Sequence, residues 1–360
     1  MSARKLRVAI LYGGRSAEHE VSVVSARSVM AAIDRSKYDV VPIAITKSGR
    51  WMLPAKEPAH LSAPEGSLPG TGEDGTSVVL TREANGTELT PVGGSGAGRV
   101  DVVFPVLHGP YGEDGTVQGM LELAGVAYAG AGVLASALGM DKEMQKQLFR
   151  ARGLPVVAHF HVHTEDWQRG AESVLELARE EIGLPCFTKP SSLGSSIGVS
   201  KCRTVDELRA GLDLALSHDR KALVERAIAG RELECAVLGN DEPEASVVGE
   251  VVPHREFYDF QAKYIEEGSE LRIPAPIPEA VSEEVRRLAV EAFRAIDCAG
   301  MARVDFFYDE TTGTVYLNEI NTIPGFTPIS MYPKLWEASG IPYAKLIDRL
   351  IELAFDRHRP

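Results

Sequence analysis

The sequence predicts a protein of three units that combines α/β and α+β architecture, and three observations support this. The chain has 360 residues, which is the length of two or three domains at about 150 residues each. Near the N-terminus, apolar strand-like runs alternate with helical patterns, which indicates a parallel sheet covered by helices. Further along, short strands bounded by turn residues alternate with helices, and a hairpin precedes a closing helix.

The N-terminal unit is expected to span residues 1–133 and to hold the parallel α/β sheet. Its alternating strands and helices are expected at 5–12, 21–33, 38–46, 100–107 and 116–124. Residues 54–98 are rich in Gly, Pro, Ser, Thr and Glu. This composition predicts a long surface insertion, with short strands at most and no chemistry.

The central unit is expected at 134–225 and the C-terminal unit at 226–360. For the central unit, helical spacing occurs at 138–152, 171–181 and 205–216, and strand patterns occur at 159–163, 185–189, 197–201 and 222–225. For the C-terminal unit, the expected order is a strand at 233–238, an irregular stretch at 253–271, a helix at 278–296, a hairpin of 302–308 with 314–320, and a helix at 344–356.

Charge and cysteine usage narrow the function classes. A net charge of −13 repels phosphate backbones and anionic lipid, so neither nucleic acid nor a membrane is an expected partner. A small anionic substrate then requires basic groups concentrated in one cleft. No apolar run approaches the roughly 20 residues of a membrane span. Cysteines 186, 202, 235 and 298 form no CxxC motif, which is typical of reduced, buried thiols in a cytoplasmic protein.

A Gly/Ser-rich segment, Phe187–Gly198, is a candidate phosphate-binding loop. Neither GxxxxGK followed by Ser or Thr, nor GxGxxG after the first strand, is present, so the two commonest nucleotide motifs are excluded. In this segment small residues let backbone N–H groups approach phosphate oxygens, and Lys189 adds a positive charge. A flexible hairpin loop explains the same composition, so both interpretations stay open.

The C-terminal hairpin carries the clearest candidate metal site. Side chains alternate faces along a strand, so Arg303 and Asp305 share one face, and Glu319 and Asn321 share one face. A turn near Thr311 would pair 305 with 317 and 303 with 319, which places all four polar groups together. The other face then takes Val304, Phe306, Tyr316, Asn318 and Ile320.

Two carboxylates and an amide oxygen suit Mg²⁺ held against phosphate oxygens. Arg303 beside them would contact the same phosphates or a developing oxyanion. The alternative is a solvated strand face with cross-strand ion pairs. Directly afterwards, Gly325 could present its N–H to a reacting carbonyl, and Ser330 could bind a carboxylate, although a plain turn is the alternative there.

Taken together, these segments resemble the D-alanine–D-alanine ligase family of the ATP-grasp superfamily. The matching segments occur in the family's order and are Gly13–Ser22, Leu107–Gly119, Met140–Lys142, Lys189–Gly198, Arg303–Asp305, Leu317–Thr327 and Ser330–Pro333. The resemblance covers nearly the whole chain apart from 54–98. It implies the ATP-grasp fold, in which ATP lies between the second and third units.

The resemblance also implies roles for individual residues. The ATP-binding positions fall on Lys142, Lys189, Glu225, Ala227, Ile228, Glu232 and Lys263. The family's two Mg²⁺ ions, for which Mn²⁺ can substitute, would be held by Asp305, Glu319 and Asn321. A closing loop matches Tyr258–Tyr264, from which Lys263 would reach the γ-phosphate.

The catalytic positions come from the same resemblance. Glu18 would hold the first ammonium with His108 close by, and Ser330 would meet the second carboxylate. Glu18, Ser195 and Tyr264 would form a hydrogen-bonded trio, and Arg303 with the Gly325 N–H would form an oxyanion hole. Each has a plainer interpretation: Glu18 as a charge favouring its helix start, His108 as a structural residue in a turn, and Tyr264 as a loop anchor.

The implied function is ATP-dependent joining of two D-alanine molecules through an acyl phosphate, for peptidoglycan synthesis, by a cytoplasmic homodimer. A D-alanine–D-lactate ligase is the nearest alternative, but its usual closing-loop histidine is replaced here by Lys263 and Tyr264. A non-catalytic nucleotide-binding protein is the more distant alternative. It is disfavoured because every metal ligand and the phosphate lysine are present.

Overall fold

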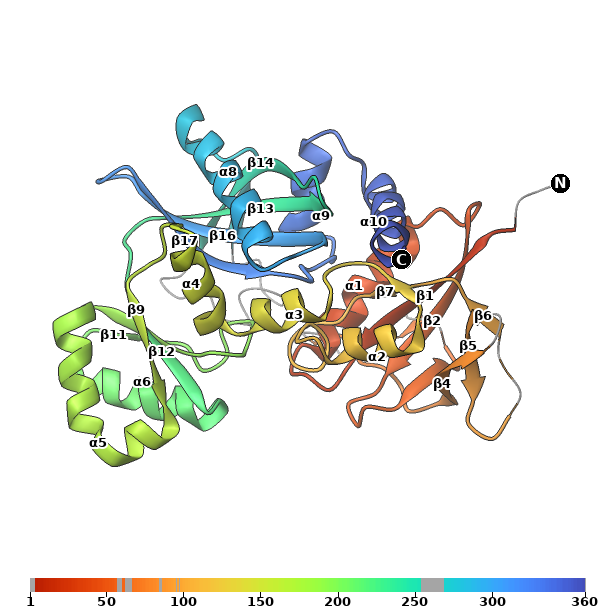
Figure 1. Ribbon diagram of the computed structural model, residues 1–360, viewed down its shortest axis with the longest axis horizontal. Coiled ribbons are helices and arrows are strands. Elements are labelled where there is room, and N and C mark those ends of the chain that lie inside the picture. The colour runs from red at the N-terminus through yellow and green to blue at the C-terminus, as the bar shows by residue number, and fades with distance from the viewer. Residues whose placement is uncertain are drawn as a thin grey trace.

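The computed structural model describes residues 4–56, 60–61, 67–83, 86–94, 96, 98–253 and 269–359. These residues form three β-sheets, each covered by helices (Figure 1). The sheets draw on residues 6–128, 159–226 and 231–321 in turn. The division of the chain into units at 133 and 225 stays a prediction.

The first sheet has eight strands in the order β6-β5-β4-β3-β2-β1-β7-β8. Its strands are β1 (Leu6–Gly13), β2 (Tyr38–Ile45), β3 (Trp51–Pro54), β4 (Gly75–Glu83), β5 (Gly86–Pro91), β6 (Gly98–Val100), β7 (Val102–Pro105) and β8 (Ala127–Tyr128). Strands β2, β1, β7 and β8 pair in parallel, as the alternating pattern predicts. Its helices are α1 (His19–Ala32) and α2 (Thr116–Ala124).

Part of the predicted surface insertion is a component of this sheet. Strands β4, β5 and β6 lie within or beside residues 54–98 and extend the sheet by antiparallel pairing. Val78 and Leu89 are buried in the same core as β1 and β2. The short strands that the composition allows therefore do form, and all three contribute core residues, Val100 being that of β6.

The second sheet has four strands in the order β11-β10-β12-β9. They are β9 (His159–His163), β10 (Cys186–Pro190), β11 (Ser200–Cys202) and β12 (Lys221–Arg226). Helices α5 (Thr164–Leu177) and α6 (Val205–His218), with a short π-helical turn (Ala178–Ile182), cover one face and share a core with Ala222 and Val224. Because strand residues alternate, Glu225 faces the other side of the sheet.

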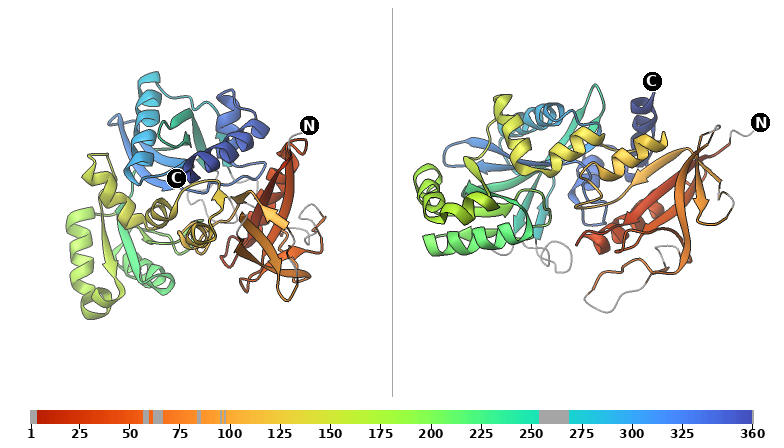
Figure 2. Two further views of the ribbon diagram at one scale, coloured as in Figure 1. Left: turned by 45° about the vertical axis from the view of Figure 1, so that its right-hand side comes forward. Right: turned by 60° about the horizontal axis from the view of Figure 1, so that its bottom comes forward.

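The third sheet has five strands in the order β15-β14-β13-β16-β17. They are β13 (Arg231–Gly239), β14 (Glu244–Pro253), β15 (Ser269–Arg272), β16 (Gly300–Asp309) and β17 (Thr314–Asn321). Helix α8 (Glu279–Ala295) packs on one face. Helices α9 (Met331–Ala338) and α10 (Tyr343–His358) pack on the other, and α10 also contacts α1, β7 and β8 of the N-terminal sheet (Figure 2).

The single helix expected at 138–152 is wrong, because the chain forms two helices there. Helix α3 (Val133–Met140) ends before Asp141, and α4 (Lys142–Ala151) begins directly after it. Asp141 has an extended backbone, and its side chain accepts the N–H groups of Glu143 and Met144 as an N-cap. An aspartate that caps the second helix therefore interrupts the helical pattern. No helix among the described residues is long and apolar enough to cross a membrane.

Candidate active site

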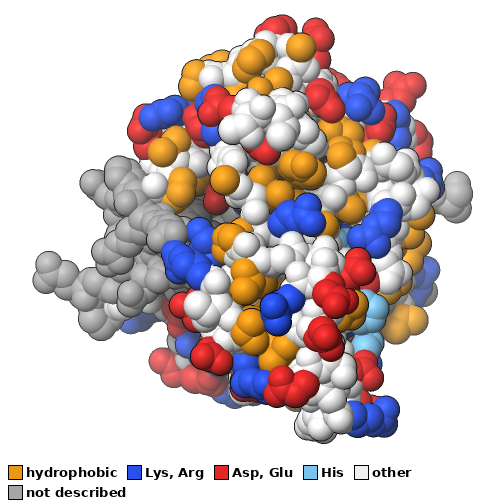
Figure 3. All heavy atoms as spheres, turned by 90° about the vertical axis from the view of Figure 1, so that its left-hand side faces the viewer, with side chains coloured by type: hydrophobic (Ala, Val, Ile, Leu, Met, Phe, Trp, Pro, Cys, Tyr) orange, Lys and Arg blue, Asp and Glu red, His pale blue; other side chains and the backbone are white. Residues whose placement is uncertain are grey.

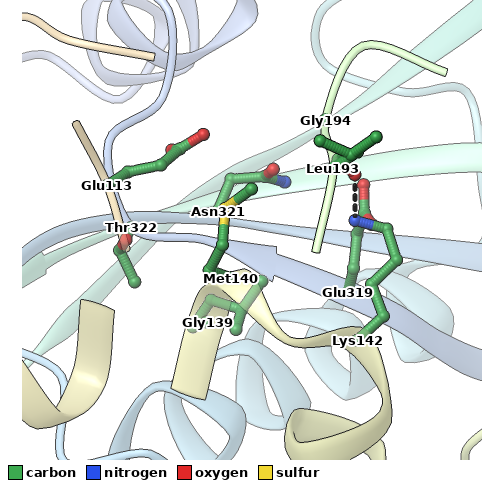
Figure 4. A pocket seen from close by; sticks show the side chains of 10 residues that line it. Glu113, Gly139, Met140, Lys142, Leu193, Gly194, Glu319, Asn321 and Thr322 are labelled. Carbon is green, nitrogen blue, oxygen red and sulfur yellow. Dashed lines mark hydrogen bonds and ion pairs between the residues drawn. The ribbon is translucent and has the colours of Figure 1, made fainter. Parts of the chain in front are cut away.

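Loops from the first two sheets and the edge strand of the third meet at one pocket (Figure 4). Glu113 precedes α2, and Lys142 begins α4. Leu193 and Gly194 belong to the Gly/Ser loop after β10, and Glu319 and Asn321 lie on β17. The sequence therefore brings the predicted phosphate loop and the predicted metal ligands to the same place.

Glu18 and Ser195 lie together, as the resemblance implies. Glu18 stands at the start of α1, but its side chain makes no capping hydrogen bond. Instead the Ser195 hydroxyl donates a short hydrogen bond to Glu18 Oε1. Ser195 and Ser196 have φ values of 52° and 58°, a left-handed backbone that non-glycine residues rarely adopt. Tyr264, the third member of the predicted trio, lies outside the described residues.

His108 is buried beside this pair. Its Nε2 lies 3.2 Å from the Ser25 hydroxyl, and Ser16 Oγ donates a hydrogen bond to its carbonyl oxygen. Burial lowers the pKa of His108, with the charges of Glu18 and Arg303 acting in opposite directions on it. The imidazole is therefore neutral near pH 7, and it lies within electrostatic reach of both the N-terminal and the C-terminal candidate residues.

The metal hairpin has the predicted polar face but a different register. Arg303 pairs with Asn321 and Asp305 pairs with Glu319, whereas the sequence predicts 303 with 319 and 305 with 317. The register shifts after Asp305, where a bulge on β17 places Phe306 opposite Leu317. The four polar side chains still share one face, because both partners moved by two residues.

The same bulge corrects the predicted opposite face. Val304, Phe306 and Ile320 are buried, but beyond the bulge Leu317 and Val315 take the core positions, and Tyr316 and Asn318 do not. The carbonyl of Asn318 accepts a hydrogen bond of 2.7 Å from Lys146 Nζ, and its amide oxygen lies 3.5 Å from Lys189 Nζ. The extra residue is therefore held by one lysine from α4 and one from β10.

Arg303 is fixed between two carboxylates. Its Nε and one terminal nitrogen each donate to Asp305 at 2.7 Å, and its Nε lies 3.0 Å from Glu234 Oε2. Asn321 Nδ2 donates to the same Asp305 at 3.0 Å. Sequence reasoning missed Glu234, which lies on β13 opposite Asp305. The available signal was its position two residues after Glu232, which places both side chains on the same face of a strand.

Glu319 is paired with a lysine. Lys142 Nζ lies 3.1 Å from Glu319 Oε2 and donates to the Leu193 carbonyl at 3.0 Å. Burial would lower the pKa of Lys142, but Glu319 outweighs it and the pKa is raised. Among the residues that the structure describes, no group of three or more His, Cys, Asp or Glu side chains is arranged to hold a metal ion.

The donor set nevertheless fits a hard cation. Asp305 and Glu319 lie directly opposite one another, and Asn321 is two residues along the same strand face. These are oxygen donors of the kind that Mg²⁺ takes. Lys142 and Arg303 neutralise the two carboxylates in this structure.

The candidate nucleotide lysine Lys189 is bound to Glu225. Its Nζ lies 2.6 Å from Glu225 Oε1, and Lys146 Nζ lies 2.7 Å from Oε2. Burial would raise the pKa of Glu225, but the two lysines outweigh it and lower the pKa to about 2. The carboxylate is thus paired with two lysines in this structure. Sequence reasoning also missed Lys146.

The other predicted ATP-binding residues, Ala227, Ile228 and Glu232, follow Glu225 in the chain. The Ala227 N–H donates to the carbonyl of Pro185 at 3.2 Å, and Ile228 is half-buried. Glu232 is on β13, on the same face as Glu234 and opposite Phe307 of β16. Lys263 lies outside the described residues.

Gly325 and Ser330 adjoin one another in the turn before α9. Ser330 Oγ accepts the Thr327 N–H at 3.0 Å and lies 2.8 Å from the Thr327 hydroxyl. A Cβ at Gly325 would come within 2.7 Å of Ser330 Oγ. Any side chain at position 325 would therefore collide with the Ser330 hydroxyl. The two residues predicted to contact the substrates lie side by side.

Glu113 is a third residue that sequence reasoning missed. It lies within His108–Gly115, and its Oε1 accepts the Gly109 N–H at 2.8 Å. Burial, reinforced by the nearby charge of Glu18, raises its pKa to about 8. Its position within Leu107–Gly119, one of the segments that resemble the ligase family, was the signal that could have identified it.

Comparison with known proteins gives a consistent result along the chain. Residues 7–131 match the family described as "D-ala D-ala ligase N-terminus", and residues 148–352 match "D-ala D-ala ligase C-terminus". The chain is 48% identical over 364 residues to the D-alanine–D-alanine ligase of Geobacillus thermodenitrificans, covering 99% of this chain and 97% of that protein. It is 52% identical over 371 residues to that of Mycolicibacterium vanbaalenii, covering 99% of each.

Solved structures agree with the sequence matches. The D-alanine–D-alanine ligase from Coxiella burnetii is 38% identical with a TM-score of 0.83, over 99% of this chain and 95% of that one. The VanG D-Ala:D-Ser ligase from Enterococcus faecalis is 34% identical with a TM-score of 0.83, over 98% of this chain and 100% of that one. The matches therefore include a ligase that takes a different second amino acid.

Proposed function

The chain belongs to the D-alanine–D-alanine ligase family, and on that premise we propose how its own residues join two D-alanine molecules at the expense of ATP. The enzyme has the ATP-grasp fold and forms D-alanyl-D-alanine, a peptidoglycan precursor, through an acyl phosphate. The observation that supports the residue assignment most is the Glu18–Ser195 hydrogen bond. It joins the first loop of the N-terminal sheet to the Gly/Ser loop, beside the acidic hairpin.

In the first step, a carboxylate oxygen of one D-alanine forms a bond to the γ-phosphorus of ATP, and ADP leaves. Glu18 is suited to hold that D-alanine's ammonium group, because its carboxylate is buried and faces Ser195 rather than its own helix. Lys142 and Lys189 supply positive charge for the phosphates, and Lys263 would add to it from the closing loop. Basic groups are needed here because two anions must approach each other.

Asp305, Glu319 and Asn321 would hold two Mg²⁺ ions, for which Mn²⁺ can substitute. When bound, such ions neutralise charge on the phosphates and on the transferring group. Lys142 and Arg303, which pair with these carboxylates in the structure, would then be available to the substrates.

In the second step, the amine of the other D-alanine attacks the acyl phosphate carbonyl, and phosphate leaves. Arg303 and the Gly325 N–H would stabilise the developing oxyanion, worth roughly 3–4 kcal/mol per donor in comparable acyl transfers. Ser330 would bind the second carboxylate. Three groups can take the amine's proton: His108, which is neutral because it is buried, Tyr264, and the phosphate itself.

We also propose that the enzyme works as a homodimer in the cytoplasm. Size-exclusion chromatography with light scattering measures the assembly directly. A mass of one chain at working concentration would contradict the dimer.

The test of the function is a competition assay. The wild-type protein is incubated with ATP, Mg²⁺, D-alanine, and equal D-lactate or D-serine, and the products are resolved by mass spectrometry. We expect one ADP and one phosphate per D-alanyl-D-alanine, with the mixed products minor at pH 7. Predominant D-alanyl-D-lactate or D-alanyl-D-serine would contradict the proposed second substrate, and ATP binding without any product would indicate a non-catalytic protein.

A further inference from the structure

Lys146 is a fully buried lysine that none of the roles above explains. Its side chain is 0% exposed, one helical turn after Lys142 on α4. Its Nζ pairs with Glu225 Oε2 at 2.7 Å and donates to the Asn318 carbonyl at 2.7 Å. A single ammonium group thus joins α4 to β12 of the central sheet and to β17 of the C-terminal sheet.

Glu225 holds two lysines at once. It is 2% exposed, and its second oxygen lies 2.6 Å from Lys189 Nζ. The three side chains carry two positive charges and one negative charge, so the cluster has a net charge of +1. One positive charge therefore remains for an anionic ligand after the glutamate is neutralised.

The arrangement matters because Lys189 has to serve phosphate as well as Glu225. A buried carboxylate that loses its only cation is strongly unfavourable. If Lys189 were the sole partner of Glu225, turning towards phosphate would leave that carboxylate unpaired. With Lys146 at 2.7 Å on the other oxygen, Glu225 keeps a cation when Lys189 moves.

We propose that Lys146 is a positioning residue for the nucleotide: it keeps Glu225 neutralised and so frees Lys189 to bind the phosphates of ATP. The proposal rests on the proposed function only in taking the anionic ligand to be ATP. Lys146 itself touches no phosphate, because its ammonium is enclosed between Glu225 and Asn318. Its effect on ATP passes through Glu225 and Lys189.

A purely structural role has to be separated from this one, because Lys146 also holds the bulge at Asn318. The charge balance makes the separation possible. Lys146→Met leaves Lys189 and Glu225 as a neutral pair, in which the ammonium of Lys189 balances the charge of the Glu225 carboxylate and is held there. The double variant K146M/E225Q removes one charge of each sign, so the net charge of +1 returns and Lys189 is free again.

The experiment measures MgATP affinity by calorimetry on the full-length protein, and KM for ATP and for D-alanine. Lys146→Met is expected to weaken MgATP binding by about tenfold or more and to raise KM for ATP, with KM for D-alanine nearly unchanged. K146M/E225Q is expected to bind MgATP within about threefold of the single variant Glu225→Gln, whose own affinity measures any contact of Glu225 with the nucleotide. The control Lys37→Met, which removes an ion pair of 2.6 Å with Asp348 of α10, should bind MgATP as the wild type does.

Two results would overturn the proposal: wild-type affinity in K146M, or a loss from E225Q to K146M/E225Q as large as the loss from wild type to K146M, which would indicate a structural role alone. If K146M does not fold, the double variant decides, since affinity near that of E225Q supports the proposal and a tenfold loss relative to E225Q contradicts it. Ligation by the wild type tests the proposed function separately, because the role of Lys146 is judged from the ratio of nucleotide affinities.

Discussion

At the scale of single residues, Glu319 is the carboxylate whose loss should affect activity most directly. It lies opposite Asp305 and 3.1 Å from Lys142 Nζ, so it serves both the cation site and a nucleotide lysine. Glu319→Gln keeps the shape and removes the charge. We expect turnover to fall by about 100-fold and the Mg²⁺ requirement to rise. Initial rates across a Mg²⁺ titration measure both.

A matched control lies in the same hairpin. Glu310 is exposed and pairs with Arg231 at 3.2 Å, away from the candidate site. Glu310→Gln should leave turnover unchanged, and circular dichroism should show the native spectrum for both variants. Near-wild-type turnover of the Glu319 variant at ordinary Mg²⁺ would show that this carboxylate is not a metal ligand.

Two of the residues that sequence reasoning missed, Lys146 and Glu234, have partners that lie far along the chain. Lys146 is one of several charges on an amphipathic helix, and nothing near it indicates Glu225, its partner 79 residues later. Glu234 on β13 likewise contacts Arg303 on the neighbouring strand β16, far along the chain. By contrast, the common face of Asp305 and Arg303 could be predicted, because strand alternation is a local rule.

At the scale of elements, the hairpin register shows the same limit. The buried positions change phase between Leu317 and Ile320, but Tyr316 also suits a core face, so alternation alone does not locate the extra residue. The bulge at Asn318 is held by Lys146 and Lys189, which are more than a hundred positions away. The strands and their polar face could therefore be predicted, but their pairing depended on tertiary contacts.

Helix α9 was missed for a different reason. Pro333 lies within its first turn, and a proline there costs no helical hydrogen bond, since the first N–H groups have no partner within the helix. A proline in a Ser-Met-Tyr-Pro sequence indicates a loop when it is considered alone. The helix is stabilised because it buries the side chains of Leu335 and Trp336 in the core.

The cap of α4 supports a prediction about this element. Asp141 accepts two backbone N–H groups, and both of its oxygens contact Lys221 Nζ, at 2.8 and 2.6 Å. Asp141→Ala should destabilise the protein by about 1–2 kcal/mol and weaken nucleotide binding, because Lys142 begins the same helix. Asp141→Asn keeps the cap and should cost less. Urea denaturation of both variants measures the difference.

The charge of Asp141 gives this prediction a pH dependence. Burial would raise its pKa, but the contacts with Lys221 and Ser191 outweigh it and lower the pKa below its ordinary value. Its charge therefore adds stability above the unfolded pKa of about 4, and this stability is lost as the pH falls through the lower folded value. The gap between wild type and Asp141→Asn should close in acid. A gap that stays constant from pH 7 to acid would contradict the ion-pair contribution.

At the scale of the whole molecule, the acidic chain concentrates its basic groups where anions must bind. On the face shown in Figure 3, acidic and basic side chains are interspersed. Around the candidate site, however, Lys142, Lys146, Lys189 and Arg303 lie on adjoining elements. A net charge of −13 thus coexists with a site suited to ATP, as the sequence requires of a protein with a small anionic substrate.

The hydrophobic cores do not correspond one to one with the three sheets. One core joins Val8 and Ile10 of β1 to Met301 of β16, and α10 contributes Leu350 to it. Within the part of the chain that the structure describes, the core around Leu212 of α6 contains only residues of the central sheet and its helices or adjoining turns. The N-terminal and C-terminal sheets are therefore expected to unfold together, and the central sheet separately.

Hydrogen-exchange mass spectrometry on two core variants tests this division. Leu350→Ala and Leu212→Ala each remove a fully buried side chain and should cost about 2–5 kcal/mol. Leu350→Ala should speed exchange in both β1 and β16, although these strands belong to different sheets, because α10 contacts β16 and shares one core with β1. Leu212→Ala should speed exchange in β10 and β12 and leave β1 protected. If both variants gave the same exchange pattern, the molecule would be a single cooperative unit, and if Leu350→Ala affected β16 alone, α10 would not couple the two sheets.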